Sequence, residues 1–565
     1  MKTVLLPLAL VAAFLPGVGV VAPFVSAHAA EGTRGSPHRG GTLRLTAVTS
    51  AGTLDPQINY TSQYMQVMSV VYDGLLTYPK LQGPAGGQVV PDLARSLPDM
   101  RDGGRTWVFT LRDGIRFSSG APVTVEDVAA SLRRIFRVGA PTAGSFYGAI
   151  RGADACLRDP AHCTLADGVE TDAATGRITI HLTGPDAEFP QKMAFGHAAV
   201  LPAGVPSHDL GNEAAPGTGP YRIVASSPDR GMRLERNPFF HEWSETAQPD
   251  GYVDAIVYDY GLAEEDAVTA VERGQYDWMA GLKPLDRLGE MGSRYTAQVH
   301  VYPLYGLLFL PMNVNIPPFD NILARKAVNY ALDRRAMTIL YGGSAIAAPL
   351  CRMVPPGLLP GDGACAWTQG ADPDHPAEGG WRQPDMARAR QLVRESGTAG
   401  QDVTLIVPAT AMYVSMGTYL RDMLQAMGYR AHLHPLSAAM EGSYVQNTGN
   451  HVQISLMGWY ADYASPSNFL DTLFGCENFH AGSDNSINIS GLCDPVVREL
   501  TQRVRSIPDP QAAGLLWQQV DDRITRLAPA APMISISYVD LVSPRLGNYF
   551  ATRLYHMAFS RVWVQ

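Results

Sequence analysis

A short apolar strand enclosed by two amphipathic helices constrains the fold of this chain most strongly. Val403–Val407 is an unbroken run of apolar and β-branched residues, which is typical of a strand buried on both faces. The flanking segments Met386–Glu395 and Tyr413–Met427 carry apolar residues at helical spacing. Because a helix–strand–helix order is characteristic of sheets covered by helices, we expect an α/β fold.

The same alternation continues over most of the chain. Residues 63–76, 124–137 and 321–340 have helical periodicity, and Thr124 is a favoured N-cap residue followed by Glu126 and Asp127 in the first turn. The segment 361–383 is rich in Gly, Pro and Asp, so we expect a surface loop there. The remaining expected strands are Thr106–Leu111, Arg177–Leu182, Ile256–Tyr260 and Val452–Met457.

Length and charge limit the possible classes of protein. The chain has 565 residues, and 46% of them are hydrophobic, which suffices for several domains with cores of their own. The formal net charge is −9, and Lys and Arg are not concentrated in any run. A nucleic-acid partner requires a basic stripe, so the sequence argues against one.

The first 29 residues have the pattern of a secretory signal peptide. Lys2 precedes an apolar stretch, and Ala27-His28-Ala29 has the small-x-small form of a cleavage site, so we expect cleavage after Ala29. A membrane anchor is the alternative, but three prolines interrupt the apolar stretch. The segment contains no cysteine for a lipid anchor. We therefore expect a secreted protein without a lipid anchor, in which residues 30–39 form a flexible leader.

Six cysteines, all beyond residue 29, fall into three close pairs along the sequence. Six cysteines allow fifteen pairings, but an oxidising compartment and short loops favour pairing within each group. No CxxC motif occurs among them, so structural disulfides are favoured over zinc ligands. The expected disulfides are Cys156–Cys163, Cys351–Cys365 and Cys476–Cys493.

One carboxylate is placed among aromatic residues. Asp462 follows the expected strand Val452–Met457 and lies near Trp459, Tyr460 and Tyr463 in the sequence. Aromatic faces attract ammonium groups, and a partly desolvated carboxylate gains more from a charged partner than an exposed one does. This pattern indicates a binding site for a cation. The alternative is a turn aspartate beside aromatic residues of the core.

Motifs of the common enzyme classes are missing. The sequence contains no GxSxG, HExxH, P-loop or GxGxxG pattern. His241–Glu245 begins like a zinc-protease helix but lacks the second histidine, and Gly217–Pro220 lacks the lysine of a phosphate loop. We therefore expect a protein that is not an enzyme and that uses no cofactor or metal. A secreted hydrolase stays open as an alternative.

Eight short motifs occur in a characteristic order. Together they resemble the large solute-binding proteins of ABC importers, the family that includes dipeptide- and oligopeptide-binding proteins. The resemblance covers nearly the whole chain from about Gly40 onward. The motifs are Gly40–Leu45, Leu54–Pro56, Val71–Leu76, Val90–Ala94, Trp107–Val128, Gly217–Tyr221, Arg236–Phe240 and the series from Asn313 to Arg334.

The resemblance implies a two-lobed periplasmic binding protein (Venus flytrap) fold of the α/β class, with an extra domain on the first lobe. Such a protein closes its lobes around a solute and delivers it to an inner-membrane ABC permease; we expect a monomer. The first lobe would comprise residues 40–76, 216–304 and 531–565, the extra domain 77–215, and the second lobe 305–530, with hinges near Leu304 and Pro532.

The resemblance also assigns ligand-binding residues. In peptide-binding members, the aspartate of a Gly-Trp-x-x-Asp pattern holds the α-ammonium of the ligand, and Gly458, Trp459 and Asp462 match that pattern. The Cys476–Cys493 pair also resembles a bridge of the dipeptide-binding branch. Further ligand contacts are expected from Trp459, Tyr460 and Tyr463, and from the backbone around Tyr460 and around Ser50–Leu54, including Gly52 and Thr53.

The chain departs from the dipeptide-binding branch at one point. Members of that branch place an arginine shortly after the strand that corresponds to Val403–Val407, where it binds the peptide carboxylate. Here Pro408–Tyr413 contains no arginine, and Arg352 is the candidate for a cation from elsewhere. Short peptides are the first expectation for the ligand. An amine, a sugar, glutathione or a metal chelate is the alternative, as is a signalling or chaperone-like binder of the same fold.

Overall fold

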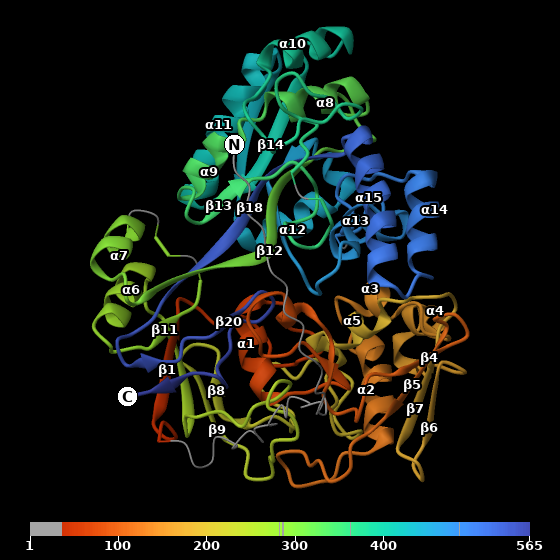
Figure 1. Cartoon of the computed structure of the whole chain (residues 1–565), viewed down its shortest axis with the longest axis vertical. Coiled ribbons are helices and arrows are strands. Elements are labelled where there is room, and N and C mark those ends of the chain that lie inside the picture. The colour runs from red at the N-terminus through yellow and green to blue at the C-terminus, as the bar shows by residue number, and fades with distance from the viewer. Residues whose placement is uncertain (1–36, 282, 285–286, 362, 485) are drawn as a thin grey trace, which may run out of the picture. The chain divides into compact units, whose positions relative to one another are not determined.

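The computed structural model describes residues 37–281, 283–284, 287–361, 363–484 and 486–565 (Figure 1). The predicted signal peptide, residues 1–29, and most of the predicted leader lie outside these residues. The described residues all belong to one compact unit, Gly32–Gln565. They alternate helices and strands, as an α/β fold requires. The predicted domain boundaries stay predictions.

The first sheet is built around the amino-terminal strand β1. This strand pairs in parallel with β10 and β11, while β9 and β8 continue the sheet in antiparallel pairs. Leu43 and Leu45 of β1 pack in one core with the buried face of α1. The elements are β1 (Thr42–Ala47), α1 (Ser62–Val71), β8 (Tyr221–Ser227), β9 (Gly231–Arg236), β10 (Ala255–Tyr260), α6 (Glu264–Glu272), β11 (Trp278–Met279) and α7 (Leu288–Arg294).

The segment between α1 and β8 contains a second, antiparallel sheet in the order β4-β5-β7-β6. The helix α2 packs against β6 and β7. It begins as predicted, because the Thr124 side chain and Asp127 form a capping box. The elements are β2 (Leu76–Thr77), β3 (Val90–Pro91), β4 (Asp99–Arg101), β5 (Thr106–Thr110), α2 (Val125–Arg137), α3 (Ala143–Tyr147), α4 (Ala153–Arg158), β6 (Val169–Asp172), β7 (Arg177–His181) and α5 (Phe189–Met193).

Two long antiparallel strands, β12 (Val299–Pro311) and β18 (Ala530–Leu541), form the centre of a third sheet (Figure 1). Their register shifts between Pro303 and Leu307, close to the predicted hinge at Leu304. The other strands of this sheet are β13 (Ala347–Pro349), which pairs with β18, and β17 (Met457–Tyr460), which pairs with β12.

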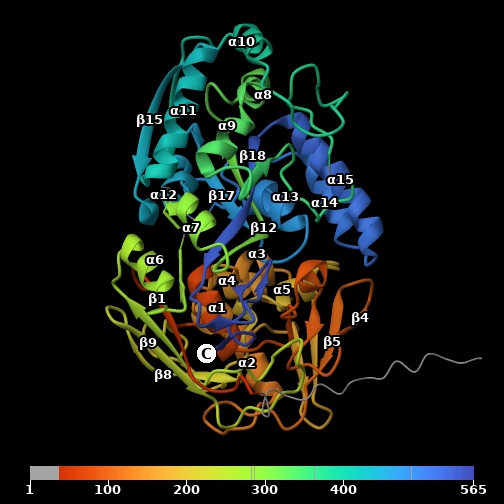
Figure 2. The ribbon, with the colours of Figure 1, turned by 60° about the vertical axis from the view of Figure 1, so that its left-hand side comes forward.

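The predicted helix–strand–helix segment forms a parallel sheet in the order β15-β14-β16. The helix α10 has the predicted bounds, and α11 lies along β15 (Figure 2). The elements are α8 (Ile322–Ala331), α9 (Arg334–Tyr341), α10 (Met386–Glu395), β14 (Asp402–Pro408), α11 (Ala411–Met427), β15 (Arg430–Leu436), α12 (Ala438–Gln446), β16 (Ile454–Ser455), α13 (Ser467–Phe474), α14 (Pro495–Val504) and α15 (Pro510–Leu527). Four two-residue strands complete the chain: β19 (Leu546–Gly547), β20 (Ala551–Thr552), β21 (His556–Met557) and β22 (Trp563–Val564).

Two predicted helices are wrong in their extent. The helix predicted over 321–340 is interrupted after Ala331, because the Asp333 side chain accepts hydrogen bonds from the backbone N–H groups of Arg335 and Ala336 and starts α9. The helix predicted over 63–76 ends at Val71, since the following chain is extended and Leu76 pairs with β3.

The strand predicted over 452–457 is also wrong in its extent. The chain pairs with β14 at Ile454–Ser455 and then changes to β12 from Met457 onward. Gly458, Trp459 and Tyr460 therefore belong to a strand rather than following one.

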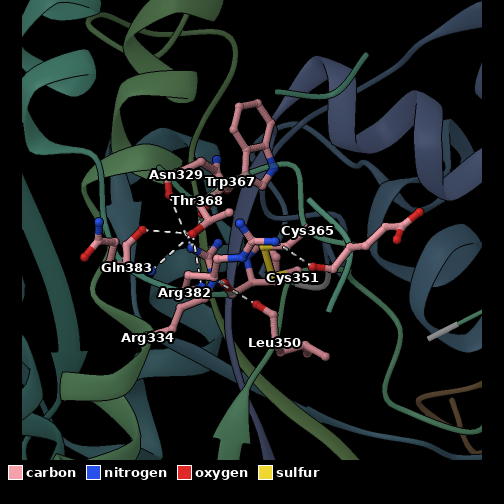
Figure 3. Close-up of a disulfide and its surroundings, with 11 residues drawn as sticks. Asn329, Arg334, Leu350, Cys351, Cys365, Trp367, Thr368, Arg382 and Gln383 are labelled. Carbon is pink, nitrogen blue, oxygen red and sulfur yellow. Dashed lines mark hydrogen bonds between the residues drawn. A yellow bond between two sulfur atoms is a disulfide. The ribbon is translucent and has the colours of Figure 1, made fainter. Parts of the chain in front are cut away.

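The three predicted disulfides are present, and one of them anchors the loop predicted over 361–383 (Figure 3). Among the described residues of that loop there is no helix or strand, as predicted. The loop does not lie entirely on the surface. Cys365, which is bonded to Cys351, is buried together with Trp367 and Thr368.

Candidate functional site

The backbone of two neighbouring strands positions Asp462. In the β12–β17 ladder, Tyr460 is paired with Gly306, and the Ala461 N–H donates to the Tyr305 carbonyl over 2.7 Å. Asp462 is the next residue, so it lies where the chain leaves β17.

The Asp462 carboxylate accepts two hydrogen bonds. The Tyr60 hydroxyl donates to Oδ1 over 2.6 Å, and the Asn468 side-chain amide donates to Oδ2 over 2.9 Å. Asn468, in α13, also accepts from the Asp462 N–H at 3.0 Å and from Trp459 Nε1 at 3.1 Å. One asparagine thus fixes both the carboxylate and the indole ring.

The Asp462 carboxylate has no positively charged partner among the described residues. The Asp462 side chain is half-buried, and burial raises its pKa to about 6, although the hydrogen bonds from Asn468 and Tyr60 lower it. Within the described part of the chain, Asp462 forms no ion pair. A ligand with a positive charge would provide the counter-charge that the protein does not supply.

Tyr60 is a site residue that the sequence did not indicate. It is 37% exposed, and its ring lies 5.4 Å from the ring of His197 and 5.7 Å from that of Phe195. His197 is itself fixed by Thr142 Oγ1 at 2.7 Å and by the Asn59 carbonyl at 3.0 Å. No sequence pattern could have revealed Tyr60, because it lies 402 positions before Asp462.

The three aromatic residues predicted to contact the ligand differ in exposure. Tyr460 is 44% exposed and Trp459 is half-buried, so both present surface near Asp462. Tyr463 is 3% exposed, accepts a hydrogen bond from Ser467 and packs edge-on against Phe146. It supports the site from the core side. Contact of these residues with a ligand stays a prediction.

Gly52 and Thr53 lie in a turn that Asn59 holds. The Asn59 amide donates to the carbonyls of Ala51 and Thr53, both at 2.8 Å, and the Thr53 hydroxyl donates to Asp209. Gly52 has a φ of +90°, which favours glycine. Because Asn59 immediately precedes Tyr60, this turn is linked to the Asp462 site. The contact of Gly52 and Thr53 with a ligand stays a prediction.

The absence of an arginine after β14 is not compensated by Arg352. Arg352 Nη1 lies 3.3 Å from Asp521 and Nη2 lies 3.8 Å from Asp522, both in α15, so its charge is already neutralised. The stretch Pro408–Tyr413, which follows the strand residues 403–407, contains no arginine, and Tyr413 is half-buried in the first turn of α11.

In residues 37–281, 283–284, 287–361, 363–484 and 486–565, no group of three or more His, Cys, Asp or Glu side chains has an arrangement that could hold a metal ion. Over the same residues, no helix is both long and apolar enough to cross a membrane.

The known proteins that this chain resembles are solute-binding proteins. The model of the bacterial extracellular solute-binding proteins, family 5 Middle, matches residues 88–481. A dipeptide-binding protein of Pseudomonas aeruginosa is 24% identical over 530 residues, covering 88% of this chain and 91% of that protein. The nickel-binding periplasmic protein of Escherichia coli is 24% identical over 524 residues, covering 88% and 90%. Among solved structures, the clavulanic acid biosynthesis oligopeptide binding protein 2 superposes with a TM-score of 0.81 at 24% identity, covering 93% of this chain and 96% of that one. These likenesses confirm the two-lobed α/β fold that the sequence predicts.

Proposed function

This chain belongs to the bacterial extracellular solute-binding proteins, family 5, and from that premise we propose that it captures short peptides and delivers them to an inner-membrane ABC permease. Asp462 holds the free α-ammonium of the peptide. The protein acts as a monomer and catalyses no reaction. Its predicted signal peptide directs it to the periplasm.

The observation that carries the proposal is the carboxylate of Asp462. It is half-buried, it has a raised pKa, and it forms no ion pair with any described residue. A positive group placed there would gain a charge-assisted hydrogen bond and would remove the cost of an uncompensated buried charge. The exposed ring of Tyr460 and the half-buried ring of Trp459 offer apolar surface to the residue that carries the ammonium.

Hydrogen bonds between distant segments support capture by closure. Tyr60 belongs to the predicted first lobe and Asp462 to the predicted second lobe. Two further hydrogen bonds link the predicted extra domain to the second lobe: Ser465 Oγ donates to Glu188 at 2.5 Å, and the Ala187 N–H donates to the Arg505 carbonyl at 2.8 Å. A ligand that contacts both sides shifts the equilibrium toward the closed arrangement by its differential affinity.

The names of the relatives support peptides as the ligand, and they also support the alternative of another small solute. Dipeptide-binding and oligopeptide-binding proteins favour peptides, whereas the nickel-binding periplasmic protein and the glutathione-binding proteins show that the family also carries other solutes. The pairing of Arg352 with Asp521 favours the alternative, because it leaves a peptide carboxylate without that cation.

Isothermal titration calorimetry with trialanine and with N-acetyl-trialanine tests the proposal. Acetylation removes the ammonium and leaves the rest of the ligand, so trialanine is expected to bind and the acetylated peptide to bind at least tenfold more weakly. Equal binding of both would refute the role of Asp462. Mass spectrometry of the small molecule released on denaturation would then identify the true solute, and turnover of the peptide would indicate a hydrolase.

A further inference from the structure

A glycine lies in the middle of the long strand β12, where a residue with a side chain is normally favoured. Gly306 is buried and pairs with Tyr460 across the β12–β17 ladder. Glycine weakens the interior of a strand, because it loses more conformational freedom on folding and packs no side chain. The φ of Gly306 is not in the positive range, so the backbone does not require a glycine here. The reason for this glycine lies in its neighbours.

The Tyr460 ring occupies the space that a side chain at position 306 would take. A Cβ atom on Gly306 would lie 2.9 Å from Cδ1 and 3.2 Å from Cε1 of Tyr460. It would also lie 3.2 Å from Cγ1 of Ile536, which belongs to β18. Because two carbon atoms attract each other best at about 3.5–4.0 Å, these contacts are too short. Gly306 thus allows the ring to lie directly on the backbone of β12.

The ring lies where the two central strands of the sheet change register. The pairing of β12 with β18 shifts between Pro303 and Leu307, and this interval contains Gly306. The strands β17, β12 and β18 lie side by side in that order, so Tyr460 and Ile536 flank Gly306 from the two neighbouring strands (Figure 2). Both predicted hinges lie on β12 and β18. The Tyr460 ring is therefore seated on the strands that join the predicted lobes.

Part of this ring is exposed beside the carboxylate that we propose as the ammonium ligand. Trp459 and Ala461 pack against one hydrophobic core, and because side chains alternate along a strand, Tyr460 points to the opposite face of β17. Tyr460 is 44% exposed, although Gly306 beneath it is buried. Asp462 follows two positions later, and two extended residues span at most about 7 Å. A peptide bound at Asp462 therefore reaches the Tyr460 ring with one of its first residues.

An aromatic side chain of the peptide fits this surface best. Two aromatic rings prefer offset-stacked or edge-to-face arrangements, and such pairs gain more than their buried area alone provides. The gain is largest when the protein ring is already fixed, because ordering a mobile side chain costs conformational entropy. Contact with the backbone of β12 and with Ile536 fixes the Tyr460 ring before a ligand binds.

We propose that Gly306 is a positioning residue that seats the Tyr460 ring on β12, and that the seated ring makes the protein prefer peptides with an aromatic side chain. The inference rests on the proposed function, because it takes the peptide as bound at Asp462. A ring that only covered the glycine would stabilise the sheet and leave the choice of ligand unchanged.

Calorimetry with matched peptides tests the preference. The probes are the tripeptides with Phe at position one, two or three and Ala elsewhere, each compared with its cyclohexylalanine counterpart. Cyclohexylalanine keeps the shape and apolar character of phenylalanine closely and removes its aromaticity. At one position, the phenylalanine peptide is expected to bind at least about threefold more tightly. Equal affinities at all three positions would overturn the inference and leave peptide binding intact. If neither these peptides nor trialanine bind, the proposed function is refuted and the inference falls with it.

The variant Gly306→Ala tests the positioning. The new methyl group overlaps Cδ1 of Tyr460, so the half-exposed ring has to leave its seat while the backbone keeps its conformation. The ratio of the two affinities is expected to fall to about one. Gly289→Ala in α7 is the matched control, because a Cβ atom there meets nothing within 4 Å, and it should keep the wild-type ratio. A preference that survives Gly306→Ala would overturn the inference.

A double-mutant comparison separates positioning from stability. Tyr460→Leu removes the ring, so the preference is expected to vanish, and adding Gly306→Ala should then change the ratio no further. Urea unfolding measures the stability of each variant separately. If Gly306→Ala lowers stability and keeps the wild-type ratio, the contact is structural only and the inference is overturned. Should Gly306→Ala not fold, Tyr460→Leu decides alone, since a preference that persists without the ring would equally overturn the inference.

Discussion

The Tyr60 hydroxyl lies 2.6 Å from Oδ1 of Asp462, although 402 positions separate the two residues. This hydrogen bond connects the chain just before α1 with the chain just after β17. Tyr60 thereby contributes to the charge state of the residue that we propose as the ammonium ligand, because its hydroxyl lowers the pKa that burial raises.

Asp462→Asn should weaken the binding of trialanine by about 2–5 kcal/mol, the usual range for removing one side of a buried charge pair. Calorimetry at pH 7.5 measures the change. The variant should fold normally, because burial penalises the ionised carboxyl above pH 6 and the amide removes that penalty. Asp229→Asn, at an exposed position, is the control. A loss below a few tenths of a kcal/mol would exclude the proposed role.

The affinity for trialanine should fall as the pH falls from 7 to 5. The pKa of Asp462 in the free protein is about 6, so below that pH the carboxyl binds a proton that must leave before an ammonium can bind. The peptide ammonium stays charged in this range, since its ordinary pKa is about 7.7–8.0. Tyr60, Tyr147 and Tyr463 stay neutral, because burial raises the pKa of each. We expect a loss of about tenfold at pH 5, and no pH dependence from this group in Asp462→Asn. A constant affinity down to pH 5 would contradict the assignment.

Tyr60→Phe should move the midpoint of that pH profile upward. The hydrogen bond from the Tyr60 hydroxyl lowers the pKa of Asp462. Without that hydroxyl, only the hydrogen bond from Asn468 counteracts the effect of burial, so the pKa of Asp462 should rise above about 6. Phe keeps the ring that packs against Phe195 and His197, so the fold should be retained. The measurement is the affinity for trialanine between pH 5 and 8 in both proteins. If the midpoint stays where it is in wild type, the hydrogen bond does not form in the ligand-free protein.

Local signals account for the parts of the fold that the sequence predicted. The capping box of Thr124 and Asp127 fixes the start of α2, and the apolar periodicity of residues 386–395 matches α10 at both ends. The break between α8 and α9 was missed because the apolar spacing continues through Leu332, while the decisive event is one side chain, Asp333, binding the backbone ahead of it.

The candidate site was only partly predictable, because its contacts are not local. Asp462 could be singled out from a motif of neighbouring residues. Tyr60 and Asn468 could not, since their role depends on how β12, β17 and α13 bring distant segments together.

Arg334→Lys should lower the free energy of unfolding by about 2–4 kcal/mol. The Arg334 side chain is fully buried, and Nε donates to the carbonyls of Leu350 at 2.8 Å and Pro532 at 2.9 Å. Nη1 donates to the Trp367 carbonyl at 3.2 Å, so one guanidinium links α9 to the disulfide-anchored loop and to β18 (Figure 3). No ion pair with a described residue neutralises it, and burial lowers its pKa to about 9.

A lysine cannot replace this side chain. Its single ammonium cannot reach the same set of carbonyls, and each charge-assisted hydrogen bond to a neutral acceptor that is lost costs about 1.5–3 kcal/mol before the structure relaxes. Urea unfolding at pH 7 measures the difference. The matched control is Arg335→Lys at the next, exposed position, where the change should stay within about 0.5 kcal/mol. If both variants unfold at the same urea concentration, the carbonyl contacts of Arg334 do not hold this part of the structure together.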